Sequence, residues 1–401
     1  MIHELRKQFN KNFTEKNYHE FLTDLDTGLK YPTDFRVCET PLFISEQLNN
    51  NLISACDHIV NQIQNDDFLK RSGDAVPERL KIPNETKIPH FLQIDFAIAT
   101  ENGKLIPKLI ELQAFPSLYG YQWYFDNVLR KHFQMPSDYT AYFNGFEEKS
   151  YNELLRKVIV GSSDPENVIL LEIHPEEQKT RIDFAATERL VGIKTVCLTK
   201  VFKKGSKLFY KEAGKEISID RIYNRVIFDE LDRKGLSYNF DFRDDIDVYW
   251  TSHPNWFFKI SKFSLPQLKG KNVPECYFLA ELEKYPDDLN NFVLKPLFSF
   301  AGLGVDVEVT KEKLDLINNK ENYILQRKIE YAPLIETPDG HSKVEIRMMF
   351  LWPEESYSNQ SDKNLPVLVN NLIRTSKGKM MGVDFNKNKT WVGSSIAYHP
   401  L

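Results

Sequence analysis

The chain has 401 residues, of which 41% are hydrophobic, 13% aromatic and 27% charged, as in a folded protein with two or three structural units. Its 52 Lys and Arg against 57 Asp and Glu give a net charge of −5, which leaves no basic excess to neutralise a nucleic-acid backbone. No apolar run approaches the roughly 18 residues of a membrane span, and the first residues lack the apolar stretch of a secretory signal. We therefore expect a cytoplasmic protein that binds neither nucleic acid nor membrane.

The first 160 residues predict helices and one β-hairpin. Ser45 is the expected N-cap of a helix whose apolar side chains recur at helical spacing. Two apolar runs flank Asn102-Gly103, the strongest short-range signal for a hairpin. The hairpin strands are expected at 91–100 and 104–113, further helices at 121–133 and 148–160, and a loop at 66–90.

The middle of the chain predicts a parallel sheet. A buried strand at 168–173, a helix at 178–191 and a second strand at 193–198 alternate as in an α/β unit. A short hairpin at 207–219 and a strand at 221–226 follow.

The C-terminal part predicts more strands and a small-residue loop. Lys295 ends a strand that Pro296 stops, and Gly302 and Gly304 follow in the loop. A lysine placed in this way can contact nucleotide phosphates, and a glycine-containing loop lets backbone N–H groups close over them. An ordinary hairpin with a surface lysine is the alternative. The strands are expected at 291–295, 305–309, 323–329, 344–351, 367–374 and 379–385.

Several familiar catalytic sites are excluded by their missing motifs. The sequence contains no GxSxG, HExxH or Walker A motif, and its four cysteines form no CxxC pair. The nine histidines never pair at metal-ligand spacing, so a metal would be held by oxygen ligands, as Mg²⁺ is.

The order of the C-terminal elements resembles the ATP-grasp fold, in which two α+β subdomains hold ATP between them. Lys295-Pro296, YILQRKIEYAP and NNLIRTSKG resemble segments of eukaryotic-type glutathione synthetase in the same order. LQIDF, IELQAFPS, NWFFKISKFSLPQL and the run from VILLEIHPEEQ to IDRIYNRV resemble glutathionylspermidine synthase. The resemblance covers roughly residues 90–395.

This resemblance implies an α/β fold with an α+β ATP-grasp region and a Rossmann-like unit before it. We expect an N-terminal helical segment with the hairpin at 1–159, packed with the ATP-grasp region. The Rossmann-like pre-ATP-grasp unit is expected at 160–246 and the nucleotide-binding region at 247–401.

The resemblance also implies site residues. Arg374 matches an arginine associated with the acyl substrate or the transferred phosphate, and Lys259 is a rival to Lys262 as the first nucleotide lysine. Ser299 stands where glutathione synthetase has a metal-binding glutamate, and Ser376 where it has a further nucleotide lysine. The expected nucleotide-binding residues are Lys262, Lys295, Ser299, Gly302, Gly304, Gln326, Lys328 and Ile329.

The hairpin at 91–113 is the expected metal site. Glu111 and Gln113 are two apart on one strand and leave the same face, and the turn brings Asp95 roughly opposite. The family places aspartate, glutamate and asparagine in these roles, so glutamine replaces asparagine here. Asp384 and Asn386 are a competing pair of Mg²⁺ ligands.

The implied activity is that of an ATP-dependent ligase that forms a C–N bond. It would use ATP and Mg²⁺ to join a small-molecule or peptide carboxylate to an amine through an acyl phosphate. Two alternatives stay open: an ATP-dependent phosphotransferase on the same fold, and a non-catalytic ATP-grasp-like binding protein. The identity of the substrates and the oligomeric state are left open by the sequence.

Overall fold

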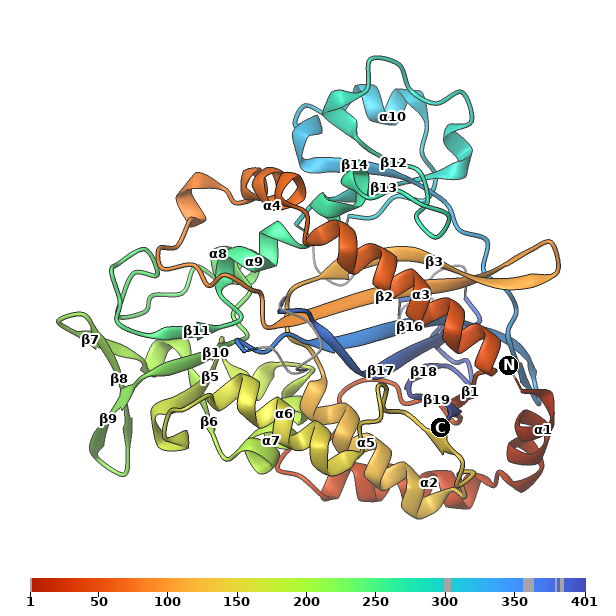
Figure 1. Ribbon diagram of the computed structural model, residues 1–401, viewed down its shortest axis with the longest axis horizontal. Helices are drawn as coiled ribbons and strands as arrows, with labels where there is room; N and C mark the ends of the chain where they lie inside the picture. The colour runs from red at the N-terminus through yellow and green to blue at the C-terminus, as the bar shows by residue number, and fades with distance from the viewer. Residues whose placement is uncertain (1, 299–303, 356–363, 379–380, 383–385) are drawn as a thin grey trace.

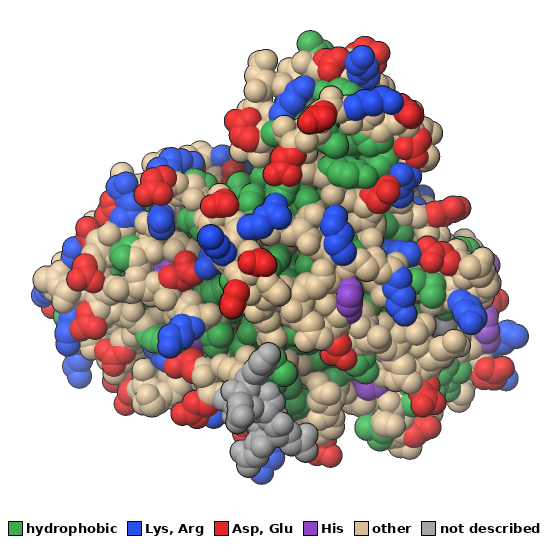
Figure 2. Space-filling model, turned by 45° about the horizontal axis from the view of Figure 1, so that its top comes forward, with side chains coloured by type: hydrophobic (Ala, Val, Ile, Leu, Met, Phe, Trp, Pro, Cys, Tyr) green, Lys and Arg blue, Asp and Glu red, His purple; other side chains and the backbone are tan. Residues whose placement is uncertain are grey.

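A computed structural model gives the fold and describes residues 2–298, 304–355, 364–378, 381–382 and 386–401. Figure 1 shows a large sheet, a smaller sheet at one end of the molecule with helices beside it, and a lobe that stands above the body. Acidic and basic side chains are interspersed over the face drawn in Figure 2. The expected α/β class is confirmed by this mixture of helices and sheets.

The large sheet contains the predicted hairpin. It has six strands in the order β18-β17-β16-β2-β3, with β15 paired to β16. Asn102 and Gly103 connect β2 to β3, and both have positive φ (50° and 73°), as a type I′ turn requires. The strands are β2 (Phe91–Glu101), β3 (Lys104–Gln113), β15 (Ile335–Thr337), β16 (Gly340–Leu351), β17 (Val367–Ser376) and β18 (Gly393–Ser395).

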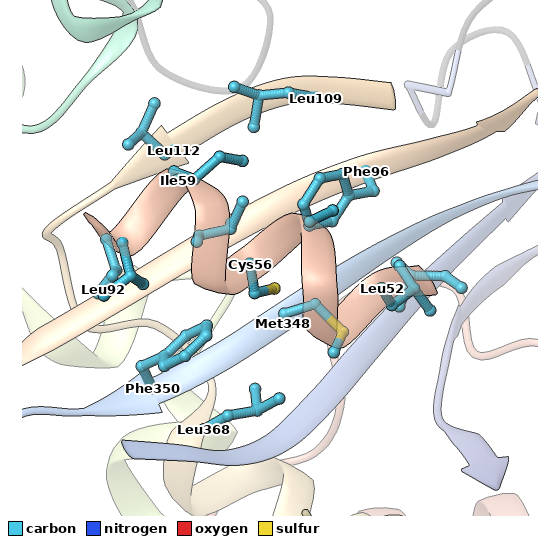
Figure 3. Close-up of a cluster of buried hydrophobic side chains, with 14 of the residues drawn as sticks. Leu52, Cys56, Ile59, Leu92, Phe96, Leu109, Leu112, Met348, Phe350 and Leu368 are labelled. Atoms are coloured by element: carbon cyan, nitrogen blue, oxygen red, sulfur yellow. The ribbon is translucent and has the colours of Figure 1, made fainter. Parts of the chain in front are cut away.

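One face of this sheet packs against helix α3 (Glu46–Ile63). The Ser45 side chain accepts a hydrogen bond from the backbone N–H of Leu48 and so begins the helix as expected. Because strand side chains alternate, every second residue of β2 faces this helix, and the intervening Gln93 and Asp95 face the other way. Figure 3 shows the core: Leu52, Cys56, Ile59, Leu92, Phe96, Leu109, Leu112, Met348, Phe350 and Leu368.

A β-bulge interrupts β3 at Ile110. Asp95 pairs with Glu111 and Phe96 with Leu109, so Ile110 is an extra residue without a partner in the ladder. The bulge keeps Leu109 in the core, on the same face as Leu112. The carbonyl group of Ile110 is free to accept a hydrogen bond from outside the sheet.

The opposite face of the large sheet is covered by helices at one end. Phe91, Met349 and Leu351 pack there into a core with α6 and α7, and the Tyr119 hydroxyl of α5 donates to the carbonyl of Phe350 at 2.8 Å. The helices are α5 (Tyr119–His132), α6 (Glu148–Val160) and α7 (Arg181–Val191).

The smaller sheet is parallel, as predicted. Its strand order is β11-β10-β5-β6, so the chain leaves β5 toward β6 and later returns to the other side of β5. A separate antiparallel sheet, β7-β8-β9, projects from this end (Figure 1). The strands are β5 (Val168–Glu172), β6 (Lys194–Cys197), β7 (Phe202–Lys204), β8 (Lys207–Glu212), β9 (Lys215–Ile219), β10 (Arg221–Asn224) and β11 (Tyr249–Thr251).

The lobe is a three-stranded sheet in the order β12-β14-β13 with its own small core. The strand predicted at 305–309 is wrong, because only Asp306 forms an isolated bridge there, to Leu294. The strand predicted at 379–385 lies largely outside the described residues, and β17 pairs with β18. The lobe elements are β12 (Cys276–Phe278), β13 (Phe292–Pro296), α10 (Lys311–Asp315) and β14 (Tyr323–Arg327).

The remaining elements lie around this framework. The loop predicted at 66–90 is partly wrong, because it begins with a short helix that Asn65 caps. Within the described part of the chain, no helix combines the length and apolar character needed to cross a bilayer. The elements are α1 (His3–Asn12), α2 (Glu15–Thr27), β1 (Leu42–Phe43), α4 (Asp66–Ser72), β4 (Tyr139–Thr140), α8 (Phe228–Lys234), α9 (Pro254–Lys259) and β19 (Ala397–Pro400).

The close contact of α5 with α7 depends on Gly120. A Cβ atom there would lie 2.6 Å from Oγ1 and 2.8 Å from the backbone nitrogen of Thr187. We therefore expect Gly120→Ala to lower the free energy of unfolding by about 1–3 kcal/mol, through overpacking. Urea denaturation measures this change. Gly73→Ala is the matched control, since nothing lies within 4 Å of its Cβ position. Equal stability of the two variants would contradict the tight contact.

Candidate functional site

A row of charged side chains lies on the face of the large sheet turned away from α3. The strand register places Glu111 opposite Asp95, and Asp95 opposite Arg347. One row further along, Glu345 lies opposite Arg374. Strands from distant parts of the sequence thus bring three carboxylates and two guanidinium groups together.

Asp95 is the centre of this cluster. Its side chain is 3% exposed, and both of its oxygens accept hydrogen bonds from Arg347: Nε to Oδ1 at 2.7 Å and Nη2 to Oδ2 at 2.7 Å. Arg374 Nη2 lies 3.4 Å from the same Oδ2. A bidentate, charge-assisted pair of this kind is among the strongest polar contacts in proteins.

Arg374 is held differently. Its Nη2 lies 2.7 Å from Glu345 Oε2, and the carboxylates of Glu345 and Asp95 raise the pKa of Arg374 above its ordinary value. The Tyr331 hydroxyl donates to the other oxygen of Glu345 at 2.6 Å. Although β17 is an interior strand, 44% of the Arg374 side chain is exposed, so the sheet face is uncovered at this position.

Two lysines approach the cluster from the side of the lobe. Lys295 Nζ donates to the carbonyl of Ile110, the bulge residue, at 3.2 Å and to Gln326 Oε1 at 2.5 Å. Burial lowers the pKa of Lys295, and the nearby Glu111 carboxylate opposes that shift. Lys262 Nζ lies 3.4 Å from Glu111 Oε1, and its side chain is 8% exposed.

The rival lysine points elsewhere. Lys259 pairs with Glu85, and its ammonium lies 4.2 Å from the ring centroid of Trp256. Of the two candidates, the structure brings Lys262 to the cluster.

The expected adenine hinge lies at the end of β14. Gln326 is buried, and its Nε2 donates to the Leu109 carbonyl at 3.2 Å, beside the bulge. The backbone N–H of Lys328 already donates to the Asn291 carbonyl at 2.7 Å, and Ile329 follows it outside the strand. Gly304 has a φ of +75° and packs closely on Pro296, whereas Ser299 and Gly302 lie outside the described residues.

The three expected magnesium ligands do not fit a metal ion in this arrangement. Both oxygens of Asp95 are bound to Arg347, and Glu111 is paired with Lys262. The Gln113 amide either donates from Nε2 to Gln93 Oε1 at 2.7 Å or, turned over, directs its oxygen at Arg347 at 3.0 and 3.1 Å. No group of three His, Cys, Asp or Glu side chains in the described ranges could hold a metal ion.

The competing ligand pair is only partly described. Asp384 lies outside the described residues. Asn386 Oδ1 accepts hydrogen bonds from the Ser376 hydroxyl at 3.0 Å and from the backbone N–H of Lys377 at 3.0 Å. Asn386 therefore holds Ser376 and Lys377 at the end of β17.

Sequence reasoning missed a second buried charge, at the junction with the parallel sheet. Arg225 follows β10 and is 3% exposed, and its guanidinium lies 4.9 Å from the Phe115 ring centroid and 5.3 Å from that of Phe184. Its Nε and Nη1 have no hydrogen-bond partner among the described residues. The end of β5 beside it carries Glu172, where burial raises the pKa to about 8 against the effect of Arg225.

This junction lies where parallel sheets of this type commonly bind ligands. The chain passes from β5 to β6 on one side and later returns as β10 on the other side of β5, and Glu172 and Arg225 lie at the carboxyl ends of β5 and β10. The signal that could have found them is the strand order, which the sequence alone does not provide.

Comparisons with known proteins support the fold. No protein-family model matches the chain, and no sequence among the curated proteins is significantly similar to it. Among solved structures, a glutathione synthetase-like effector from Globodera pallida in its apo form is similar, with a TM-score of 0.57 and 11% sequence identity. The similarity covers 100% of this chain and 97% of that chain. At this identity it shows a glutathione synthetase-like fold and nothing finer.

The raised pKa of Glu172 predicts a pH dependence of stability. Because the folded carboxyl holds its proton up to about pH 8, the folded state binds more protons than the unfolded state between about pH 4.5 and 8. Stability contributed by this group is therefore lost as pH rises through that window. We expect urea unfolding at pH 5, 6.5 and 8 to show that the free energy of unfolding of Glu172→Gln rises relative to that of the parent as pH increases, by up to a few kcal/mol. A constant difference would show that Arg225 keeps Glu172 ionised.

Proposed function

We propose that the protein is an ATP-dependent carboxylate–amine ligase of the ATP-grasp type. The observation that carries the proposal is the convergence of cationic side chains where the lobe meets the large sheet. Four cations and three carboxylates meet there, which leaves an excess positive charge for an anionic ligand. The cations are Lys262, Lys295, Arg347 and Arg374, and the carboxylates are Asp95, Glu111 and Glu345.

In this proposal the lysines bind the nucleotide phosphates. Lys295 is fixed by the Ile110 carbonyl and Gln326, and Lys262 by Glu111, so both ammonium groups are in place before a ligand arrives. Burial disfavours the charged form of Lys295, and a phosphate group would favour it again. Gln326, Lys328 and Ile329 would border the adenine at the end of β14.

Arg374 is the residue proposed to act on the acyl substrate. A substrate carboxylate oxygen attacks the γ-phosphorus of ATP, and ADP leaves with the electron pair of the broken P–O bond. An amine nitrogen then attacks the acyl carbon and inorganic phosphate leaves. Arg374 can donate bidentate hydrogen bonds to the carboxylate or to the transferred phosphate, because its guanidinium is partly exposed on the uncovered face. The chemistry requires positioning and charge neutralisation more than covalent participation.

The proposal concerns the reaction class. The glutathione synthetase-like fold supports it, whereas the motifs that resemble glutathionylspermidine synthase come from the sequence alone. The substrates are proposed only as a small-molecule or peptide carboxylate and an amine.

A non-catalytic binding protein on the same fold is the second candidate. The observation in its favour is Asp95, whose two oxygens are bound to Arg347 instead of being directed toward a ligand.

Trapping of the acyl phosphate tests the reaction class. With ATP, a panel of carboxylic acids and hydroxylamine, the ligase should produce a hydroxamate together with ADP. Arg374→Lys keeps the charge but loses the fork, so the hydroxamate yield should fall while ATP affinity stays nearly unchanged. ADP release on a hydroxyl acceptor without hydroxamate would indicate a phosphotransferase. ATP binding without turnover on any acid would favour the binding protein.

Lys295 should carry much of the phosphate binding. A hydrogen bond to a charged group contributes about 1.5–3 kcal/mol, so Lys295→Ala should weaken ATP binding by about 10- to 100-fold in calorimetric titrations. Lys313→Ala is the matched control, because Lys313 is a lobe lysine paired with Asp306 on the surface. Unfolding curves of both variants check that the lobe stays folded. Equal affinity of Lys295→Ala and parent would assign Lys295 a structural role.

A further inference from the structure

We propose that Arg347 is a built-in cation that occupies the place of a metal ion at Asp95 and Gln113. The sequence pattern of Asp95, Glu111 and Gln113 is that of oxygen ligands on one strand face, and the structure fills their common space with a guanidinium group. This inference goes beyond the proposed ligase activity and does not require it.

The ion pair of Arg347 and Asp95 has close to ideal geometry. Arg347 Nε and Nη2 each lie 2.7 Å from one oxygen of Asp95, in the fork that a carboxylate accepts best. The side chains are 13% and 3% exposed, so little water competes for these contacts. A metal ion could reach the Asp95 oxygens only after the guanidinium had left.

The other two expected ligands, Gln113 and Glu111, are also engaged by protein groups. Gln113 is engaged in either orientation of its amide: its Nε2 donates to Gln93 Oε1 at 2.7 Å, or, with the amide turned, its oxygen lies 3.0 Å from Nη2 and 3.1 Å from Nη1 of Arg347. Glu111, opposite Asp95 in the register, is paired with Lys262 at 3.4 Å. Oxygen ligands that would neutralise a divalent cation are thus neutralised by side chains of the chain itself.

Exchange of the guanidinium for a metal ion would cost free energy. Displaced from Asp95, Arg347 would remain on an interior strand as a buried positive charge beside the incoming metal ion. Breaking a buried pair in this way is strongly unfavourable, because the freed charge is left without compensation. The folded protein therefore excludes divalent cations from Asp95 whether or not a nucleotide binds elsewhere.

Manganese binding tests the proposal without reference to activity. Mn²⁺ prefers the same carboxylate and carbonyl ligands as Mg²⁺, and electron paramagnetic resonance reports its free concentration. We expect the parent to take up no equivalent of Mn²⁺ that depends on Asp95. Arg347→Ala removes the bidentate partner of Asp95 and leaves only its longer, 3.4 Å contact with Arg374, so this variant should bind one equivalent of Mn²⁺ at least tenfold more tightly than any Mn²⁺ held by the parent. The double variant Arg347→Ala/Asp95→Asn should lose this gain.

A second arginine–aspartate fork provides the control. Arg243 binds both oxygens of Asp241 on the surface, at 3.1 and 2.7 Å, so Arg243→Ala frees a lone aspartate and should gain no Mn²⁺ site. An equivalent of Mn²⁺ bound by the parent and lost in Asp95→Asn would overturn the proposal, as would a folded Arg347→Ala that gains nothing. If Arg347→Ala does not fold, titration of the parent and of Asp95→Asn still tests whether Asp95 binds Mn²⁺. These titrations contain no nucleotide, so their outcome does not depend on whether the protein is a ligase.

Discussion

The candidate site depends on one constraint, a buried carboxylate in the interior of an antiparallel sheet. Asp95 lies on β2 with β3 on one side and β16 on the other, and an ionised side chain at such a position needs a cation close by. Arg347 supplies it from the adjacent strand. The same register then places Glu345 against Arg374, so one pairing of strands orders the whole charged row. A slip of one residue would turn Asp95 into the core beneath α3.

The bulge at Ile110 connects this row to the lobe. Without the extra residue, Leu109 would leave the core face. With it, Lys295 and Gln326 of the lobe sheet hydrogen-bond to the carbonyls of Ile110 and Leu109. These contacts hold the Lys295 ammonium group at the edge of the charged row. The bulge therefore helps to determine where this charge of the lobe lies.

The hairpin was predictable because its information is local. Asn102-Gly103 determines the turn, and the turn length determines that Asp95 lies near Glu111. Arg347 could not be assigned in the same way, since its strand pairs with β2 from about 250 residues away and side-chain alternation does not give the register between distant strands. The strand predicted at 305–309 was wrong for a related reason: alternating apolar residues occur there, but only Asp306 finds a partner.

Arg347 and Arg374 differ in their partners and in their exposure. Arg347 directs Nε and Nη2 at the two oxygens of Asp95, and only 13% of its side chain is exposed, so it neutralises that carboxylate without reaching outward. Arg374 rests against Glu345 with nearly half of its side chain exposed, and retains donors that can reach a ligand. A metal ion bound to phosphate departs with the nucleotide, whereas a guanidinium group on an interior strand stays. A site built in this way keeps the Asp95 carboxylate neutralised permanently and leaves Arg374 as the partly exposed cation of the sheet face.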